Sequence, residues 1–337
     1  MKPELITIGS CTLDCILSID DVLRFELFEK EMIKKYTAIE YSRKLNIEGV
    51  RFVPGGSAAN IASNCSMLGL KSTYIGILGD DFSAQICIED MKERGVDLSQ
   101  VKQTEKDNTA LSVILKTDWG KDRSILAYKG ANNLLTPEDV NPELFDEIKA
   151  FAWTSLTEDK ACKAIDKAIT LTRENGGMVL AAPSMSIIKN NPKWAKILIQ
   201  KSDCISLNRE EALEFTQESD TINAISHFSD LGLDLVSITN GSKGSFVSDG
   251  ETIVRSDVYD GDVEDTTGAG DAFLSGLLIC CLRDIPLSRA ARIASSMALF
   301  ESQEVGVREG IPTDFSTLEE FIDSHDLRQN ISKFVPS

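Results

Sequence analysis

Short apolar runs alternate with helix-type segments along most of this chain, and this alternation restricts the folds that the chain can adopt. Apolar runs of strand length begin near residues 5, 72, 150, 178, 203 and 235. Segments with helical spacing of apolar residues lie between them, for example "SAANIASNCSMLG" and "KACKAIDKAITLTRENGG", and most end at a glycine. Alternating strands and helices form a mostly parallel sheet that is covered on both faces. The sequence therefore predicts an α/β fold of the doubly wound type.

Two segments interrupt this alternation. Residues 110–130, "ALSVILKTDWGKDRSILAYKG", have the pattern of two strands joined at 118–122. Residues 14–54 contain two strand-like runs, "CILSI" and "GVRFVP", and between them a charged stretch, 22–45, that we expect to be helical. Both segments follow strand ends, where α/β proteins bind ligands. We therefore expect one domain over 1–337, with a small β-sheet lid built from about 14–54 and 108–130.

The charge and the cysteines exclude several classes of function. With 53 acidic and 35 basic residues the net charge is −18, so we expect neither a nucleic-acid nor a membrane partner. No run approaches the roughly 18 apolar residues of a membrane span, and no signal sequence is found. The eight cysteines form no CxxC pair and the chain has only two histidines, which argues against a zinc site or a Ser/His/Asp triad. We expect a cytoplasmic protein.

The stretch "DTTGAGDAF" places glycines directly before an apolar helix. The helix is expected to begin near Gly268, so the amides of Gly268, Ala269 and Gly270 have no acceptor one turn earlier. Together with the helix dipole, these amides form an anion site that suits a phosphate. Asp271 follows them on the first turn. Taken alone, it could be an acid that gains only about 0.3–1 kcal/mol from the helix dipole.

Two further groups of polar residues lie where a ligand crevice is expected. In "VPGGSAANIA", Gly55 and Gly56 form a tight turn ahead of a helix that carries Asn60, and Asp14 follows the first strand. A carboxylate and an amide together can hold neighbouring sugar hydroxyls, although a helix start and a solvated loop acid would leave the same pattern. In "NREE", Asn208 and Glu211 are either a helix cap or oxygen ligands around hydrated Mg²⁺.

These motifs occur in one order along the chain, and together they resemble a known family. "PGGSAANIA" and "DTTGAGDAF", with "GDD" at Gly79, "NREE" at Asn208 and "ITNGSKGSF" at Ile238 between them, are similar to the ribokinase-like (pfkB) carbohydrate kinases. The resemblance covers Gly9 to about Pro312. It implies a three-layer α/β/α core with a β lid that often also forms a homodimer contact. It also implies transfer of the γ-phosphoryl group of ATP, with Mg²⁺, to a hydroxymethyl group of a sugar or nucleoside.

The resemblance also assigns roles to individual residues. Asp271 matches the catalytic base, and the amides of Gly268, Ala269 and Gly270 match the anion hole. The other matches are the substrate-binding residues Asp14, Gly55, Gly56 and Asn60, the nucleotide-binding residues Thr239, Gly241, Gly244 and Asn208, the magnesium motif of Asn208 and Glu211, and a monovalent-cation site, for K⁺ in some members, at Asp265 and Thr267.

The acceptor remains open at the level of the sequence. A sugar phosphate would need cationic residues in the lid, for which Arg51, Arg123 and Lys129 are candidates. A non-catalytic regulator that binds a sugar or nucleoside is an alternative of a different class. A nicotinamide-dependent oxidoreductase would share the fold class, but the chain lacks both G-x-G-x-x-G after its first strand and a Walker-type phosphate loop.

Overall fold

The core of the protein is a large, mostly parallel sheet. The computed structural model describes residues 2–19, 22–29, 32–117, 123–304 and 306–334, and within these its largest sheet has ten strands in the order β16-β15-β14-β13-β12-β11-β10-β1-β6-β7. The seven strands β13, β12, β11, β10, β1, β6 and β7 of this sheet run parallel to one another, and β14 to β16 are antiparallel additions at one edge. The strands are β1 (Leu5–Ile8), β6 (Ser72–Gly79), β7 (Val101–Thr104), β10 (Ala150–Thr154), β11 (Met178–Ala182), β12 (Cys204–Asn208), β13 (Leu235–Thr239), β14 (Ser245–Ser248), β15 (Thr252–Ser256) and β16 (Gln329–Lys333).

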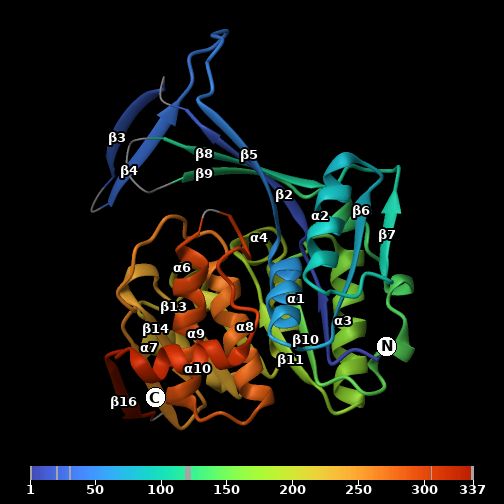
Figure 1. Cartoon of the computed structure of the whole chain (residues 1–337), viewed down its shortest axis with the longest axis vertical. Coiled ribbons are helices and arrows are strands. Elements are labelled where there is room, and N and C mark those ends of the chain that lie inside the picture. The colour runs from blue at the N-terminus through green and yellow to red at the C-terminus, as the bar shows by residue number, and fades with distance from the viewer. Residues whose placement is uncertain (1, 20–21, 30–31, 118–122, 305, 335–337) are drawn as a thin grey trace.

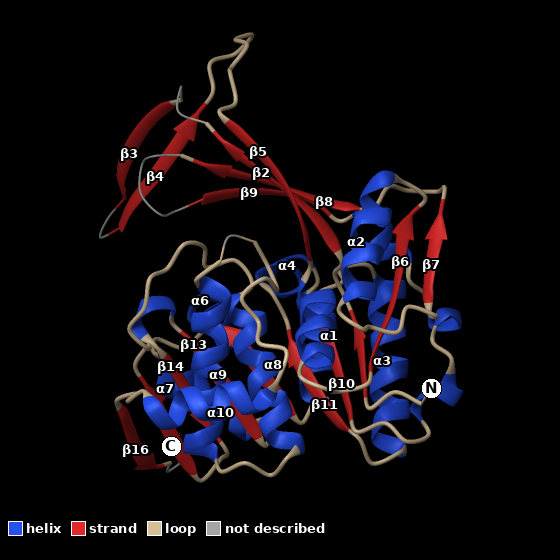
Figure 2. Cartoon of the chain, viewed as in Figure 1, coloured by secondary structure: helices blue, strands red, loops and turns tan. Residues whose placement is uncertain are grey.

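Helices cover both faces of this sheet, which confirms the three-layer prediction (Figures 1 and 2). Neighbouring residues of β1 pack on opposite sides: Ile6 belongs to the core under α3 to α7, and Leu5 to the core under α8 and α9. No helix of the described residues is long and apolar enough to span a membrane. The helices are α1 (Ser57–Met67), α2 (Phe82–Glu93), α3 (Asp159–Glu174), α4 (Met185–Asn190), α5 (Pro192–Gln200), α6 (Arg209–Thr216), α7 (Thr221–Asp230), α8 (Ala269–Leu282), α9 (Leu287–Ser302) and α10 (Phe315–Ser324).

A separate small sheet forms the predicted lid. Its strands are β5 (Gly49–Gly55), β2 (Thr12–Ser18), β8 (Ala110–Lys116) and β9 (Arg123–Tyr128), paired in that order, and they extend away from the core in Figure 1. The expected connection at 118–122 lies outside the described residues. The lid strands leave the core next to the carboxyl end of β1, so they border the crevice where a ligand is expected.

The two faces of the lid differ in polarity. Along one row across the sheet, Asp14 pairs with Ser112, which pairs with Ala127, and all three line the cavity below the lid. One position further along each strand, side chains point to the opposite face. That outer row contains Phe52, Cys15, Val113 and Leu126, so the lid turns an apolar face away from the cavity.

The prediction of a helix over 22–45 was wrong. Strands β3 (Leu23–Glu29) and β4 (Met32–Ala38) form an antiparallel pair there. Leu23, Phe25 and Leu27 recur at every second position, which is the period of a strand, whereas the glutamates and lysines of the segment suggested helical ion pairs. Cross-strand stacking of Phe25 on Tyr36, with ring centroids 5.2 Å apart, stabilises the pair.

Candidate active site

A cavity of about 270 Å³ lies between the lid and the core. Six of the site residues predicted from the sequence line it: Asp14, Gly56, Asn60, Thr267, Gly268 and Asp271. They come from β2, the start of α1 and the start of α8. The α8 segment lies more than 200 positions from the other two in the chain, and the fold brings all three together. Residues of the "PGGSAANIA" motif and of the "DTTGAGDAF" motif therefore line the same cavity.

The turn at Gly55 and Gly56 places the backbone close to its neighbours. Gly56 has a φ of 95°, and a side chain there would meet the carbonyl oxygen of Ser10 at 2.5 Å. A Cβ on Gly55 would lie 2.6 Å from a carboxylate oxygen of Asp14. The hydroxyl of Thr12 donates to Asp14 Oδ1 over 3.2 Å, which orients this largely buried carboxylate. The missing side chains thus leave room for the carboxylate and for a ligand.

The start of α8 supplies backbone amides at the same cavity. Gly268 has a φ of 84°, and a Cβ there would lie 2.5 Å from Glu301 Oε1, so only glycine fits. Ala269 and Gly270 are the first two residues of the helix. The Ala269 amide makes only a long bond of 3.4 Å to the Thr266 carbonyl, and the Gly270 amide has no backbone acceptor in the described part of the chain. The site next to Gly270 is open, because a Cβ there would meet no atom within 4 Å. This geometry suits an anion.

Asn60 and Asp271 form a direct hydrogen bond in the cavity. Asn60 Nδ2 donates to Asp271 Oδ2 over 2.7 Å. Burial raises the pKa of Asp271, the hydrogen bonds from Asn60 and Ser57 oppose this rise, and the charge of Asp14 adds to it. Asp271 is therefore a carboxylate with a stronger affinity for a proton than an exposed aspartate has.

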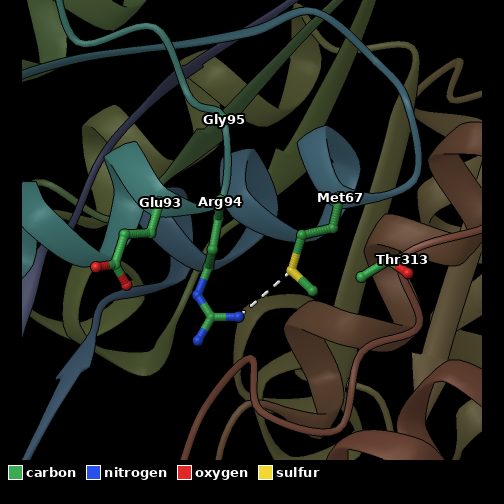
Figure 3. A pocket seen from close by; sticks show the side chains of 5 residues that line it. All are labelled: Met67, Glu93, Arg94, Gly95 and Thr313. Carbon is green, nitrogen blue, oxygen red and sulfur yellow. Dashed lines mark hydrogen bonds between the residues drawn. The ribbon is translucent and has the colours of Figure 1, made fainter.

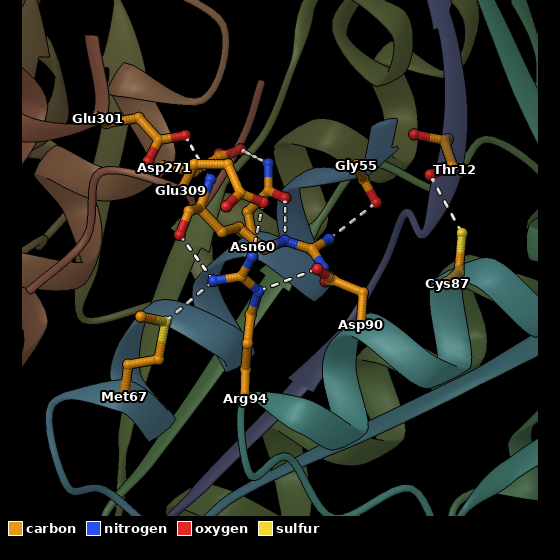
Figure 4. A network of polar contacts seen from close by, with 11 residues as sticks. Thr12, Gly55, Asn60, Met67, Cys87, Asp90, Arg94, Asp271, Glu301 and Glu309 are labelled. Carbon is orange, nitrogen blue, oxygen red and sulfur yellow. Dashed lines mark hydrogen bonds and ion pairs between the residues drawn. The ribbon is translucent and has the colours of Figure 1, made fainter. Parts of the chain in front are cut away.

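A side chain that was not among the predicted site residues holds Asn60. Arg308 is 1% exposed, donates from Nε to Asn60 Oδ1 over 2.8 Å and from Nη2 to the Gly55 carbonyl over 3.1 Å, and forms an ion pair with Asp90 (Figure 4). Because an arginine only donates, Asn60 must turn its oxygen toward Arg308 and its amino group toward Asp271. No motif marks a single arginine in a loop, so nothing in the sequence indicated this role.

Glu301, at the end of α9, is a second buried group that the sequence did not reveal. Its Oε1 accepts from the amide of Arg308 over 2.7 Å, and Oε2 has no hydrogen-bond partner among the described residues. Burial raises the pKa of Glu301 to about 7, and the charge of Asp271 contributes to this. This carboxyl lies directly behind Gly268.

Asn208 and Glu211 lie at the carboxyl end of β12 and cap α6. Glu211 donates its amide to Asn208 Oδ1 over 2.9 Å, and its Oε2 accepts from the Asn208 amide over 3.0 Å. Its Oε1 accepts from the amide of Met185, next to Ser184, which lines the cavity. Asn208 and Glu211 thus form the helix cap that was one of the two alternatives for this motif. Burial, followed by the charges of Asp271 and Glu210, raises the pKa of Glu211.

The "ITNGSKGSF" motif forms a turn beside Asn208. Thr239 pairs with Asn208 at the ends of β13 and β12. Gly241 and Gly244 follow with φ values of 53° and 82°, and a Cβ on Gly244 would collide with the carbonyl of Ser256 at 1.9 Å. These residues do not line the cavity of Asp271. They form a separate group at the carboxyl ends of neighbouring strands.

Asp265 and Thr267 lie in the loop before α8. The Thr267 hydroxyl and amide donate to Asp265 Oδ1 over 2.6 and 3.0 Å, and Lys116 Nζ lies 2.8 Å from Oδ2. Burial alone would raise the pKa of Asp265, but the bonds from Lys116 and Thr267 outweigh it and lower that pKa. In the described part of the chain, no cluster of three or more His, Cys, Asp or Glu residues has the geometry of a metal site.

A second hollow lies away from these groups. Met67, Glu93, Arg94, Gly95 and Thr313 line it (Figure 3), and none of them was predicted to act in the site. Arg94 extends from it toward the loop of Arg308, whose carbonyl accepts from Arg94 Nη1 over 2.7 Å.

Comparisons with known proteins find similar sequences and similar folds. The family model of the pfkB family carbohydrate kinases matches residues 16–314. The ATP-dependent 6-phosphofructokinase of Thermoanaerobacterium thermosaccharolyticum is 25% identical over 88% of this chain and 94% of its own length, and the aminoimidazole riboside kinase of Salmonella typhimurium is 28% identical over 82% and 90%. A provisionally named ribokinase II of E. coli, solved with ATP and Mg²⁺, has a TM-score of 0.79 at 20% identity and covers 96% of this chain and 100% of its own.

Proposed function

Because this chain belongs to the pfkB family of carbohydrate kinases, and is therefore a phosphotransferase with an alcohol acceptor, we propose that it transfers the γ-phosphoryl group of ATP to a hydroxymethyl group of a sugar or nucleoside. One observation carries the proposal. Asp271 shares a cavity with the glycine-rich start of α8 and with Asn60 and Asp14, so a carboxylate, an anion site and two groups for sugar hydroxyls face the same space.

Asp271 acts as the base in this proposal. Phosphoryl transfer leaves little covalent chemistry to the protein, which must align the alcohol and stabilise charge on the phosphoryl oxygens. Asp271 orients the acceptor hydroxyl and takes its proton, and its raised pKa improves it as a base. The amides of Gly268, Ala269 and Gly270 stabilise the charge on the transferred group. Loss of one such donor costs other enzymes about 10²–10³ in rate.

We place ATP along the ends of β12 and β13, with Asn208, Thr239, Gly241 and Gly244 as its contacts. Bound Mg²⁺ would neutralise phosphate charge. Asn208 and Glu211 would hold it largely through water, since both already exchange hydrogen bonds in the helix cap. Glu211 fits this role because nearby acids contribute to its raised pKa, and a site that gathers negative charge favours a cation.

A sugar phosphate is the second candidate acceptor, and Lys129 favours it. This lysine lines the cavity, lies 3.4 Å from the hydroxyl of Ser186 and makes no ion pair within the described ranges. Burial lowers its pKa. A phosphate on the acceptor would compensate for that burial, because it would supply the opposite charge.

The outer face of the lid supports a homodimer. Phe52 and Leu126 on that face are 55% and 62% exposed, and a second copy of the chain would cover them.

The cysteines support a cytoplasmic location. All eight cysteines lie in the described ranges and none forms a disulfide, as expected in a reducing compartment.

The experiment is ADP release from Mg-ATP by the purified protein across a panel of acceptors. The panel contains ribose, fructose, fructose 6-phosphate, adenosine, inosine, guanosine and cytidine, with Asp271→Asn as the inactive control. One strong responder that the control abolishes supports the proposal and identifies the acceptor class. Selective loss of fructose 6-phosphate turnover in Lys129→Met would favour the second candidate. Acceptor binding without ADP release would instead indicate a non-catalytic regulator.

A further inference from the structure

An ion pair joins the lid to the loop before α8. Lys116 Nζ, at the end of β8, lies 2.8 Å from Oδ2 of Asp265. The side chain of Asp265 is 1% exposed and that of Lys116 is 33% exposed. The pair therefore buries a carboxylate completely and leaves the ammonium at the edge of the protein.

The position of Lys116 in its strand determines when this contact can form. Ser112, Ile114 and Lys116 alternate along β8 and share the face that looks into the cavity. Lys116 thus reaches the core from the inner face of the lid, and it contacts Asp265 only when the lid lies over the site.

A buried carboxylate requires a nearby positive charge. Thr267 occupies Oδ1 of Asp265 with two neutral donors, and among the described residues Lys116 supplies a positive charge at Oδ2. The loop runs from Thr267 directly into Gly268, so the charge balance at Asp265 holds the segment that presents the anion-hole amides.

The resemblance predicted a monovalent cation at Asp265 and Thr267, and the residues as they stand do not fit one. A bound K⁺ would meet the ammonium of Lys116 at the same carboxylate oxygen, and two positive charges there would repel each other. We propose that the Lys116 ammonium is the built-in cation of this site, so that the enzyme works without K⁺ and the pair secures the closed lid. Only the measurements of enzyme activity in the test below rest on the proposed kinase function; the measurements of stability do not.

The test compares K⁺, Na⁺ and tetramethylammonium chlorides at equal ionic strength, with ADP release and thermal unfolding as separate readouts. For the wild type we expect no K⁺ activation and no K⁺-specific rise in melting temperature. Lys116→Met keeps the aliphatic stem and removes the charge. It should lose at least about tenfold in rate in tetramethylammonium, and K⁺ should restore part of the rate and raise the melting temperature. Lys116→Arg should remain K⁺-independent.

Lys102→Met is the matched control, because Lys102 pairs with Asp139 over 2.6 Å at the surface. It should respond to K⁺ as the wild type does. K⁺ activation or K⁺-specific stabilisation of the wild type would overturn the proposal, even if Lys116→Met does not fold. So would a Lys116→Met protein that behaves as the wild type in all three salts. If no acceptor releases ADP but the melting data follow the expected pattern, the proposed function fails and the inference about the cation stands.

Discussion

Asn60 Nδ2 donates a 2.7 Å hydrogen bond to Oδ2 of Asp271, across 211 positions of the chain. On its other side, the Asn60 oxygen accepts from Arg308, whose guanidinium is paired with Asp90. A chain of four polar residues therefore runs from α2 through the buried arginine to the carboxylate in the cavity. Each member fixes the orientation of the next, so the geometry of Asp271 depends on residues that do not line the cavity.

Asp271→Asn should keep the fold and lose at least about 10² in turnover. The amide has the shape of the carboxylate and still offers an oxygen to Asn60, but it takes no proton at this pH. Steady-state ADP release with the best acceptor measures the effect, and ATP binding and the melting temperature show that the site is intact. Asp14→Asn is the comparison, for which we expect mainly a higher KM for the acceptor. Near-normal turnover of Asp271→Asn would refute its role as the base.

Arg308→Met should move the acidic limb of the kcat/KM profile to higher pH. The charge of Arg308 and the hydrogen bond that it imposes on Asn60 both lower the pKa of Asp271, so their loss lets burial raise that pKa further. Since the base must be deprotonated, activity then disappears at a higher pH. The variant should also lose about 1–3 kcal/mol of stability, because the buried Asn60 oxygen and the Gly55 carbonyl lose a donor, while Asp90 keeps its second ion pair, with Arg94.

Two further variants separate these effects. Arg308→Lys keeps the charge but not the planar donor fork, so it should restore part of the pH profile. Arg292→Met removes a half-buried arginine of α9, which donates to the carbonyl of His325 over 2.8 Å, away from the cavity. It should lower stability with an unchanged pH profile. An acidic limb that stays in place in Arg308→Met would exclude the positioning role.

Glu301→Gln should flatten the pH dependence of stability. The pKa of Glu301 rises from 4.5 to about 7 on folding, so the folded state binds more protons between these values. The wild type therefore loses stability as pH rises from about 4.5 to about 7, by about 3 kcal/mol in full, and the loss persists at higher pH. Glutamine still accepts from the Arg308 amide without a charge. Thermal unfolding from pH 4 to 8 checks this, and parallel curves for both proteins would contradict it.

The parts of the fold and the site that depend on local pattern were predictable. The alternation of strands and helices indicated the doubly wound fold, and the resemblance carried by the two glycine motifs predicted that Asp14, Asn60 and Asp271 belong to one site. Residues 22–45 failed for a physical reason. Their glutamates and lysines fit helical spacing, while the apolar residues have a period of two, and cross-strand pairing decided the outcome.

The rest of the site depends on tertiary contacts that leave no local pattern. Arg308 has a φ of 74°, an uncommon conformation for arginine, and it is held there by bonds to Gly55, Asn60 and Asp90. Lys116 is one lysine in a lid strand, and its significance emerges only when Asp265 is found beside it. A single sequence does not reveal which of its many charged residues become buried partners.

Phe52→Ser combined with Leu126→Ser should convert a dimer into a monomer. Both residues lie on the outer face of the lid, away from Asp14, and each contributes about 1.5–3 kcal/mol when covered, twice in a symmetric dimer. Sedimentation equilibrium measures the change. Ile331→Ser is the control, since Ile331 is 57% exposed but lies on β16 at the far edge of the core sheet, and it should leave the dimer intact. A monomeric wild type at micromolar concentration, or dissociation of the control as well, would show that this face does not hold two copies together.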